Sequence, residues 1–179
     1  MKYKKYNLQD VYDGEAQNKF NVISTFAGGG GSSTGYRLAG GKILCINEFV
    51  EEARNTYAEN YPNTPILPDD IKELTGQELL DAANIGVGEV DILDGSPPCS
   101  AFSMAGAVVQ GKGHSAGFGQ TKKYSDGKQV ENIEDLFFEY IRVAKDIQPK
   151  VIVAENVSGL LMGEAKVYYS HITAEFGNA

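Results

Sequence analysis

Cysteine is scarce in this sequence. Only Cys45 and Cys99 occur among the 179 residues, and they lie far apart. Two cysteines at this separation support neither a disulfide framework nor a zinc site, so we expect reduced thiols. Long apolar runs are missing too, because runs such as residues 151–154 fall far short of the roughly 20 residues of a membrane-spanning helix. The first residues also lack the apolar stretch of a signal peptide, and we therefore expect a cytoplasmic protein.

Positive charge is in the minority. The sequence has 16 lysine and arginine residues against 24 acidic ones, which gives a formal net charge of -8. This balance argues against a chain that grips nucleic acid alone, because such affinity comes largely from Lys and Arg that neutralise phosphates. The stretch between Gly95 and Ser125 is an exception, since it contains no acidic residue. A glycine-rich loop that covers this stretch and extends to Lys128 could contact phosphate through the basic residues Lys112, His114, Lys122, Lys123 and Lys128.

The remaining composition is that of one globular domain, with 42% hydrophobic and 22% charged residues. Residues 1–19 are polar and unpatterned and are interpreted as an N-terminal arm, which leaves residues 20–179 as the domain. Strands are predicted at residues 21–26, 42–46, 65–67, 90–93 and 151–154, and helices at residues 34–39, 50–61, 76–83, 133–144 and 165–176. This alternation predicts a Rossmann-like α/β fold, a parallel sheet with helices on both faces.

A long gap in this pattern covers residues 96–129. The segment is rich in glycine and far exceeds the usual length of a connection in such folds. We interpret it as a functional lid or binding loop, with disorder as the alternative.

A glycine-rich turn follows the first predicted strand, at residues 26–31. Glycines between a strand and a helix let the backbone approach a nucleotide-like ligand. The strict GxGxxG pattern is absent because Ser33 stands in place of the third glycine, so a purely structural turn is the alternative.

Acidic and aromatic residues follow the next two strands. Glu48 lies 20 residues after Gly28, where an acid can accept hydrogen bonds from ribose hydroxyls, and Phe49 could stack on adenine. Asp70 could accept a hydrogen bond from the adenine amine. The alternatives are an acid at a helix N-terminus, a core aromatic and a helix cap, respectively. Together these residues fit an adenosine moiety, and the pattern leaves open a dinucleotide or S-adenosylmethionine.

Cys99 follows the fourth predicted strand in a stiff segment. Pro97 and Pro98 fix two φ angles before it, which suits a nucleophile that must meet its target atom closely. A thiolate is a strong nucleophile, although a lone cysteine after a strand is more often a buried small hydrophobe. Glu155 follows the fifth strand, and it would face the same crevice as Cys99 if strands four and five are neighbours. A helix cap or a lysine ion pair is the alternative role for Glu155.

In this order the motifs resemble the DNA cytosine-5 methyltransferase family, from about Asn21 to the last residue. The matching segments are the cofactor turn at residues 26–31, Glu48-Phe49, Asp70-Ile71, the Pro98-Cys99 elbow with residues 102–106 after it, residues 136–138 and the triplet at residues 155–157. The resemblance implies an S-adenosylmethionine-dependent methyltransferase fold. It assigns the cofactor contacts to Phe26, Ala27, Gly28, Gly30, Gly31, Glu48, Phe49, Asp70, Ile71, Pro98 and Leu136.

The resemblance also implies a reaction. The target cytosine of double-stranded DNA would be flipped out, Cys99 would add to ring carbon 6, and Glu155 would hold ring nitrogen N3. Carbon 5 would then take the methyl group from S-adenosylmethionine. The alternatives are a non-catalytic module that binds S-adenosylmethionine, an RNA cytosine-5 methyltransferase and, on the glycine turn and Glu48 alone, an NAD-dependent oxidoreductase.

The chain departs from the family in three respects. Ser24 stands where many members carry aspartate, and Ser100 where many carry glutamine. The family's target-recognition segments would follow Ala179, so the fold is expected to be incomplete at its C-terminal end and turnover to be low. A family-like strand order of 3-2-1-4-5 would leave residues 151–154 as an unpaired apolar edge, which predicts self-association or pairing with a further polypeptide.

Overall fold

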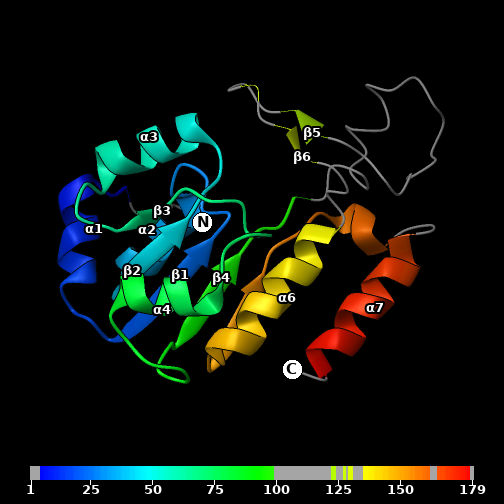
Figure 1. Ribbon diagram of the computed structural model, residues 1–179. Helices are drawn as coiled ribbons and strands as arrows, with labels where there is room; N and C mark the ends of the chain where they lie inside the picture. The colour runs from blue at the N-terminus through cyan, green and yellow to red at the C-terminus, as the bar shows by residue number, and fades with distance from the viewer. Residues whose placement is uncertain are drawn as a thin grey trace.

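The computed structural model describes residues 5–98, 122–123, 127, 129–130, 135–161 and 165–177. Its centre is a five-stranded parallel sheet in the order β3-β2-β1-β4-β7, with helices on both faces (Figure 1). The strands of the sheet are β1 (Phe20–Thr25), β2 (Gly41–Asn47), β3 (Ile66–Leu67), β4 (Ile92–Gly95) and β7 (Val151–Ala154). The predicted parallel α/β fold and the expected order 3-2-1-4-5 are both confirmed.

Helices connect these strands. They are α1 (Leu8–Glu15), α2 (Gly31–Leu38), α3 (Glu51–Asn60), α4 (Gly76–Ala83), α6 (Leu136–Ile147) and α7 (Ala165–Gly177), with a 3-10 helix η2 (Ser158–Leu161) before the last. A separate antiparallel pair, β5 (Lys122–Lys123) and β6 (Gln129–Val130), was not predicted from the sequence. Across the described ranges, no helix is both long and apolar enough to span a membrane.

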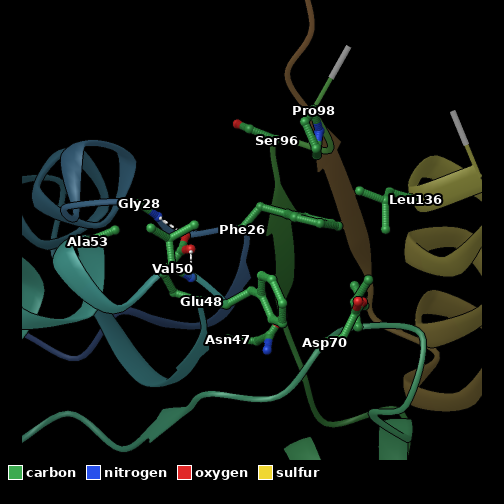
Figure 2. Close-up of a pocket in the computed structure, with 12 residues that line it drawn as sticks. Phe26, Gly28, Asn47, Glu48, Val50, Ala53, Asp70, Ser96, Pro98 and Leu136 are labelled. Carbon is green, nitrogen blue, oxygen red and sulfur yellow. Dashed lines mark hydrogen bonds between the residues drawn. The ribbon is translucent and has the colours of Figure 1, made fainter. Parts of the chain in front are cut away.

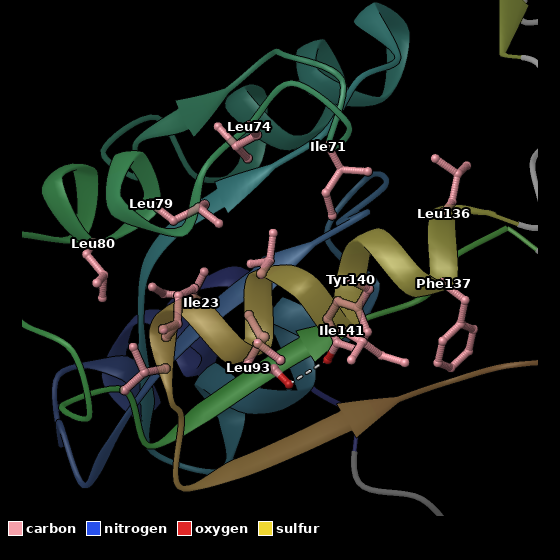
Figure 3. Close-up of a cluster of buried hydrophobic side chains, with 14 of the residues drawn as sticks. Ile23, Ile71, Leu74, Leu79, Leu80, Leu93, Leu136, Phe137, Tyr140 and Ile141 are labelled. Atoms are coloured by element: carbon pink, nitrogen blue, oxygen red, sulfur yellow. Dashed lines mark hydrogen bonds between the residues drawn. The ribbon is translucent and has the colours of Figure 1, made fainter. Parts of the chain in front are cut away.

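Each face of the sheet carries its own hydrophobic cluster. On one face, residues of α4, α6 and α7 pack with Ile23 and Leu93 (Figure 3). On the other face, residues of α1 and α3 pack with Val22 and Ile46. Val22 and Ile23 are neighbours on β1 and reach opposite clusters because successive side chains of a strand alternate. With both faces of its central strand buried, the sheet holds the carboxyl ends of its strands in fixed positions.

Helix α6 ties two strands together. Seven of its residues are buried, at Leu136, Phe137, Tyr140, Ile141, Val143, Ala144 and Ile147. The Tyr140 hydroxyl donates a hydrogen bond to the carbonyl oxygen of Leu93 on β4, 2.8 Å away, and lies 2.9 Å from the carbonyl oxygen of Val153 on β7. Burial raises the pKa of Tyr140, so this hydroxyl stays protonated and able to donate at neutral pH.

Helix α1 occupies a segment in which the sequence pattern indicates no element. A capping box between Asn7 and Asp10 starts it. It packs closely on α2, because a Cβ atom at Gly14 would lie only 2.2 Å from the carbonyl oxygen of Arg37. The Glu15 carboxylate lies 3.0 Å from the fully buried Arg37 guanidinium, which also stacks on the Tyr61 ring. Only Val11 and Gly14 of the helix are buried. The sequence does carry a signal for it, because Leu8, Val11 and Tyr12 are spaced for one helical face, and interpreting this segment as an unpatterned arm missed that signal.

Candidate active site

A pocket of about 250 Å³ opens at the carboxyl ends of β1, β2 and β4 (Figure 2). It is lined by Phe26, Gly28, Asn47, Glu48, Phe49, Val50, Ala53, Asp70, Ile71, Ser96, Pro98 and Leu136. Eight of these residues are cofactor contacts expected from the sequence, and they come from five separate segments of the chain. In open α/β sheets, ligands bind at this edge, where the strand order reverses.

The three remaining expected contacts lie in the glycine turn without lining the pocket. Ala27 is buried, and its amide donates a hydrogen bond to the carbonyl oxygen of Asn47. Gly30 has a φ of 93°, and a Cβ atom there would lie 3.0 Å from the Tyr57 ring. Gly31 is the first residue of α2. In the structure these three residues therefore shape the glycine turn and the start of α2 and do not line the pocket.

The turn itself holds a strained residue. Phe26 lines the pocket with a φ of 51°, in the left-handed region that bulky side chains rarely adopt. Gly28 has a φ of 56°, which costs a glycine nothing. Strain at a non-glycine residue persists only where its surroundings enforce it, and such positions cluster at functional sites. The conformation at Phe26 marks this turn as more than a connection.

Glu48 fastens the turn to the start of α3. Its side chain is 7% exposed, and its two carboxylate oxygens accept hydrogen bonds from the amides of Gly28, at 2.8 Å, and Val50, at 2.7 Å. Glu48 therefore also has the role that was the alternative to ribose binding, an acid at a helix N-terminus, since Val50 is the N-cap of α3. A carboxylate oxygen has a second lone pair, so these bonds leave acceptor capacity for a ligand hydroxyl.

Asp70 and Ile71 form the opposite wall of the pocket. Asp70 does not cap a helix, because Thr75 caps α4, and its carboxylate accepts a hydrogen bond from the amide of Lys72 at 3.0 Å. Arg142 on α6 donates hydrogen bonds of 2.8 Å to the carbonyl oxygens of Ile71 and Leu74. The wall is therefore held in place by a helix on the far side of the loop.

Residues that directly follow β7 form hydrogen bonds to the segment that leads to Cys99. The amide of Glu155 donates to the carbonyl oxygen of Gly95 at 3.0 Å, and the Asn156 side chain donates to that of Pro97 at 3.2 Å. The expected adjacency of the fourth and fifth strands is therefore observed, and it places the exposed Glu155 beside this segment. Cys99 itself lies outside the described residues, as do Lys112, His114 and Lys128 of the basic loop.

Sequence reasoning missed four lining residues, Asn47, Val50, Ala53 and Ser96. Asn47 ends β2, and its side chain donates to the carbonyl oxygens of Leu67, at 3.1 Å, and Asp69, at 2.9 Å. The available signal for Asn47 was its place, because a polar side chain at the carboxyl end of a predicted strand lies at the edge of the sheet where ligands bind. Val50 directly follows Phe49, Ser96 lies two residues before Pro98, and Ala53 lies in α3, four residues after Phe49.

Comparison with known proteins gives a family and a fold. The family described as "C-5 cytosine-specific DNA methylase" matches residues 20–179. The type II methyltransferase M.NgoPII of Neisseria gonorrhoeae is 34% identical over 144 residues, covering 80% of this chain and 35% of the relative. The type II methyltransferase M.AquIA of Picosynechococcus is 33% identical over 140 residues, covering 78% of this chain and 49% of the relative. The chain thus spans less than half the length of either.

Solved structures agree on the fold. A DNA modification methyltransferase encoded in an Escherichia coli prophage has a TM-score of 0.67 at 22% identity, covering 89% of this chain and 38% of that one. A mutant of DNMT2 from Spodoptera frugiperda has a TM-score of 0.56 at 20% identity, covering 88% of this chain and 41% of that one. At these identities the likeness concerns the arrangement of strands and helices.

Proposed function

The chain belongs to the C-5 cytosine-specific DNA methylase family, and on that premise we propose that it is the cofactor-binding and catalytic part of a DNA cytosine-5 methyltransferase. Members of this family use S-adenosylmethionine as the methyl donor. The observation that carries the proposal is the pocket that Gly28, Glu48 and Pro98 line together. Pro98 directly precedes Cys99 in the sequence. Relatives named type II methyltransferases favour DNA as the substrate, and a restriction-modification context, over RNA or a nicotinamide reaction.

The residues present fit an adenosine-bearing donor. Glu48 would accept hydrogen bonds from the ribose hydroxyls, and Asp70 from the adenine amine. Phe26, Phe49 and Leu136 offer apolar surface for the base. Gly28, with no side chain, leaves room for the donor beside the backbone.

Catalysis is assigned to Cys99 and Glu155. With the target cytosine flipped out of the duplex, the Cys99 thiolate forms a bond to ring carbon 6, and Glu155 holds ring nitrogen N3 and stabilises the charge that develops there. When bound, S-adenosylmethionine supplies the methyl group that carbon 5 accepts. Loss of the carbon 5 proton to a base then restores the ring double bond and expels the Cys99 thiolate. We place the protein in the cytoplasm, where bacterial DNA would be available as its substrate.

Calorimetric titration of the 179-residue chain tests the binding half of this function. S-adenosylhomocysteine, the demethylated product, is expected to bind with a micromolar dissociation constant and to raise the melting temperature, whereas NAD should do neither. Stabilisation by NAD alone would contradict the proposal and favour an oxidoreductase.

We further propose that isolated chains associate through β7. Val151 and Val153 are 51% and 37% exposed, while Ile152 between them packs on the α6 side of the sheet. The two valines therefore lie on the face that α1 and α3 cover elsewhere, where no described helix packs over them. An apolar, uncovered edge strand favours pairing with another strand, supplied by a second copy or by further polypeptide of the enzyme.

Replacing both Val151 and Val153 with lysine is expected to shift the chain toward monomer, because charges on an edge strand oppose pairing. Light scattering after size exclusion, over a range of concentrations, measures the change. Val87→Lys is the matched control, since Val87 is 53% exposed in the loop after α4. A wild-type chain that stays monomeric at every concentration would contradict self-association.

A further inference from the structure

A buried carboxylate lies behind the pocket without lining it. Asp94 of β4 is 4% exposed and accepts hydrogen bonds from three hydroxyl groups. Its Oδ2 atom accepts hydrogen bonds from the hydroxyl groups of Ser24, at 2.9 Å, and Ser32, at 2.8 Å, and its Oδ1 atom accepts one from the Tyr36 hydroxyl at 3.1 Å. Within the described ranges, Asp94 takes part in no ion pair. Its charge is therefore balanced by directed hydroxyl groups instead of a cation.

The three donors connect Asp94 to two other elements. Ser24 is the residue of β1 directly opposite Asp94 in the sheet. Ser32 and Tyr36 belong to α2, four residues apart, and so present their side chains on one face of that helix. Asp94 thereby joins β4 to β1 and to the first turns of α2.

This junction lies between two walls of the pocket. Gly28, four residues before Ser32, belongs to one wall, and Ser96 and Pro98, just after Asp94, belong to another. A change in the Asp94 contacts would therefore alter the position of the glycine turn relative to the segment that carries Cys99.

Burial of a carboxylate is costly unless it is well hydrogen-bonded. Hydroxyl groups that donate to an ionised oxygen form stronger bonds than neutral pairs, and the N-terminus of α2 adds a favourable field. Burial, together with the neighbouring Asp94 carboxylate, raises the pKa of Tyr36, so its hydroxyl remains a donor. Three strong bonds of fixed direction give this position little freedom to move.

Ser24 is a second feature of this site. It faces Asp94 directly across the parallel pair of β1 and β4. A carboxylate at either of these two positions would therefore lie in the same row of the sheet.

We propose that Asp94 is a positioning residue for the methyl donor, which holds the glycine turn, through Ser32 and Tyr36, at a fixed place relative to Ser96 and Pro98. The inference rests on the proposed function, because its effect is on donor binding. It predicts that the carboxylate is required in this row of the sheet, on either strand.

Titration of S-adenosylhomocysteine into variants of the 179-residue chain tests the proposal. Asp94→Asn is expected to weaken binding on the order of tenfold, since the amide carries no charge and its NH₂ group cannot accept from the hydroxyl groups that face it. Ser32→Ala removes a single donor from the helix side and should weaken binding about threefold to fivefold. Asp91→Asn is the control. Asp91 directly precedes β4, at the end of the strand away from the pocket, where it accepts hydrogen bonds from the Asn21 amide and the Lys150 side chain. This variant should leave the affinity unchanged even where the melting temperature falls.

An exchange variant separates positioning from simple stability. Asp94→Ser alone should bind poorly, and adding Ser24→Asp should return the affinity to within about threefold of wild type, since the charged acceptor is restored to the same row. Failure of the wild-type chain to bind would contradict the proposed function itself. If wild type binds and Asp94→Asn binds equally well, or if a folded exchange variant shows no recovery, the role of Asp94 is refuted. Should Asp94→Asn not fold, Ser32→Ala decides, and an affinity equal to wild type refutes the role.

Discussion

Replacing Cys99 with alanine is expected to abolish the covalent complex with DNA that contains 5-fluorocytosine. By the proposed mechanism, the Cys99 sulfur would bond to carbon 6 of this substrate and carbon 5 would accept the methyl group, but fluorine cannot leave as the proton does. The ring double bond is not restored, and the enzyme stays attached. The complex survives denaturation, so a gel-shifted band or an intact mass measures it directly. The effect is expected to be complete, because the bond is made by the Cys99 sulfur and alanine has no nucleophilic atom in its side chain.

Cys45 provides the matched control. It is fully buried on β2, where its Sγ atom lies 3.5 Å from the carbonyl oxygen of Leu79. Burial raises the pKa of Cys45 to about 12, so at neutral pH it is a protonated thiol and a poor nucleophile. Cys45→Ala should therefore retain the adduct. The chain is to be assayed alone and together with the C-terminal segment of a type II relative, and an adduct that is absent from both, or that persists in Cys99→Ala, contradicts the mechanism.

The sheet was predictable from the sequence because its strands are short apolar runs between helical patterns. Burial on both faces explains these runs in β1, β2 and β4, whereas β7 is apolar although it is exposed on one face. All five strands were found within a few residues of their predicted ends. Helix α1 was missed, although Asn7 and Asp10 form a capping box and Val11 has an apolar helical spacing with Leu8 and Tyr12. Its contacts with α2, the close approach of Gly14 and the Glu15 ion pair, leave no pattern in the sequence.

The candidate site was predictable to the extent that its residues follow strand ends. Glu48, Asp70 and Pro98 each do so, and the pocket includes all three. Asp94 could not be found in this way, because its proposed role depends on the register that places it opposite Ser24 and on the hydrogen bond from Ser32 of α2. Register is set by side-chain packing across the whole sheet, which a single strand does not reveal. The meeting of Cys99 with Glu155 stays a prediction, since Cys99 lies outside the described residues.

Glu48→Gln is expected to weaken binding of S-adenosylhomocysteine on the order of 100-fold, because two effects act together. The carboxylate now accepts hydrogen bonds from two backbone amides, Gly28 and Val50. A glutamine side chain would present an NH₂ group to one of them, so that two donors face each other and the glycine turn loosens. The change also removes a charged acceptor for the ribose hydroxyls.

Glu52→Gln makes the same chemical change in the first turn of α3, on an exposed side chain outside the pocket. It should leave the dissociation constant within about twofold of wild type, because exposed charges contribute little to a site they do not touch. Both variants are to be titrated at equal ionic strength, with melting temperatures recorded to separate lost affinity from lost folding. Equal affinity of Glu48→Gln and Glu52→Gln would show that Glu48 only caps the start of α3. A loss confined to Glu48→Gln, in a chain that still folds, would show that the Glu48 carboxylate is required for donor binding.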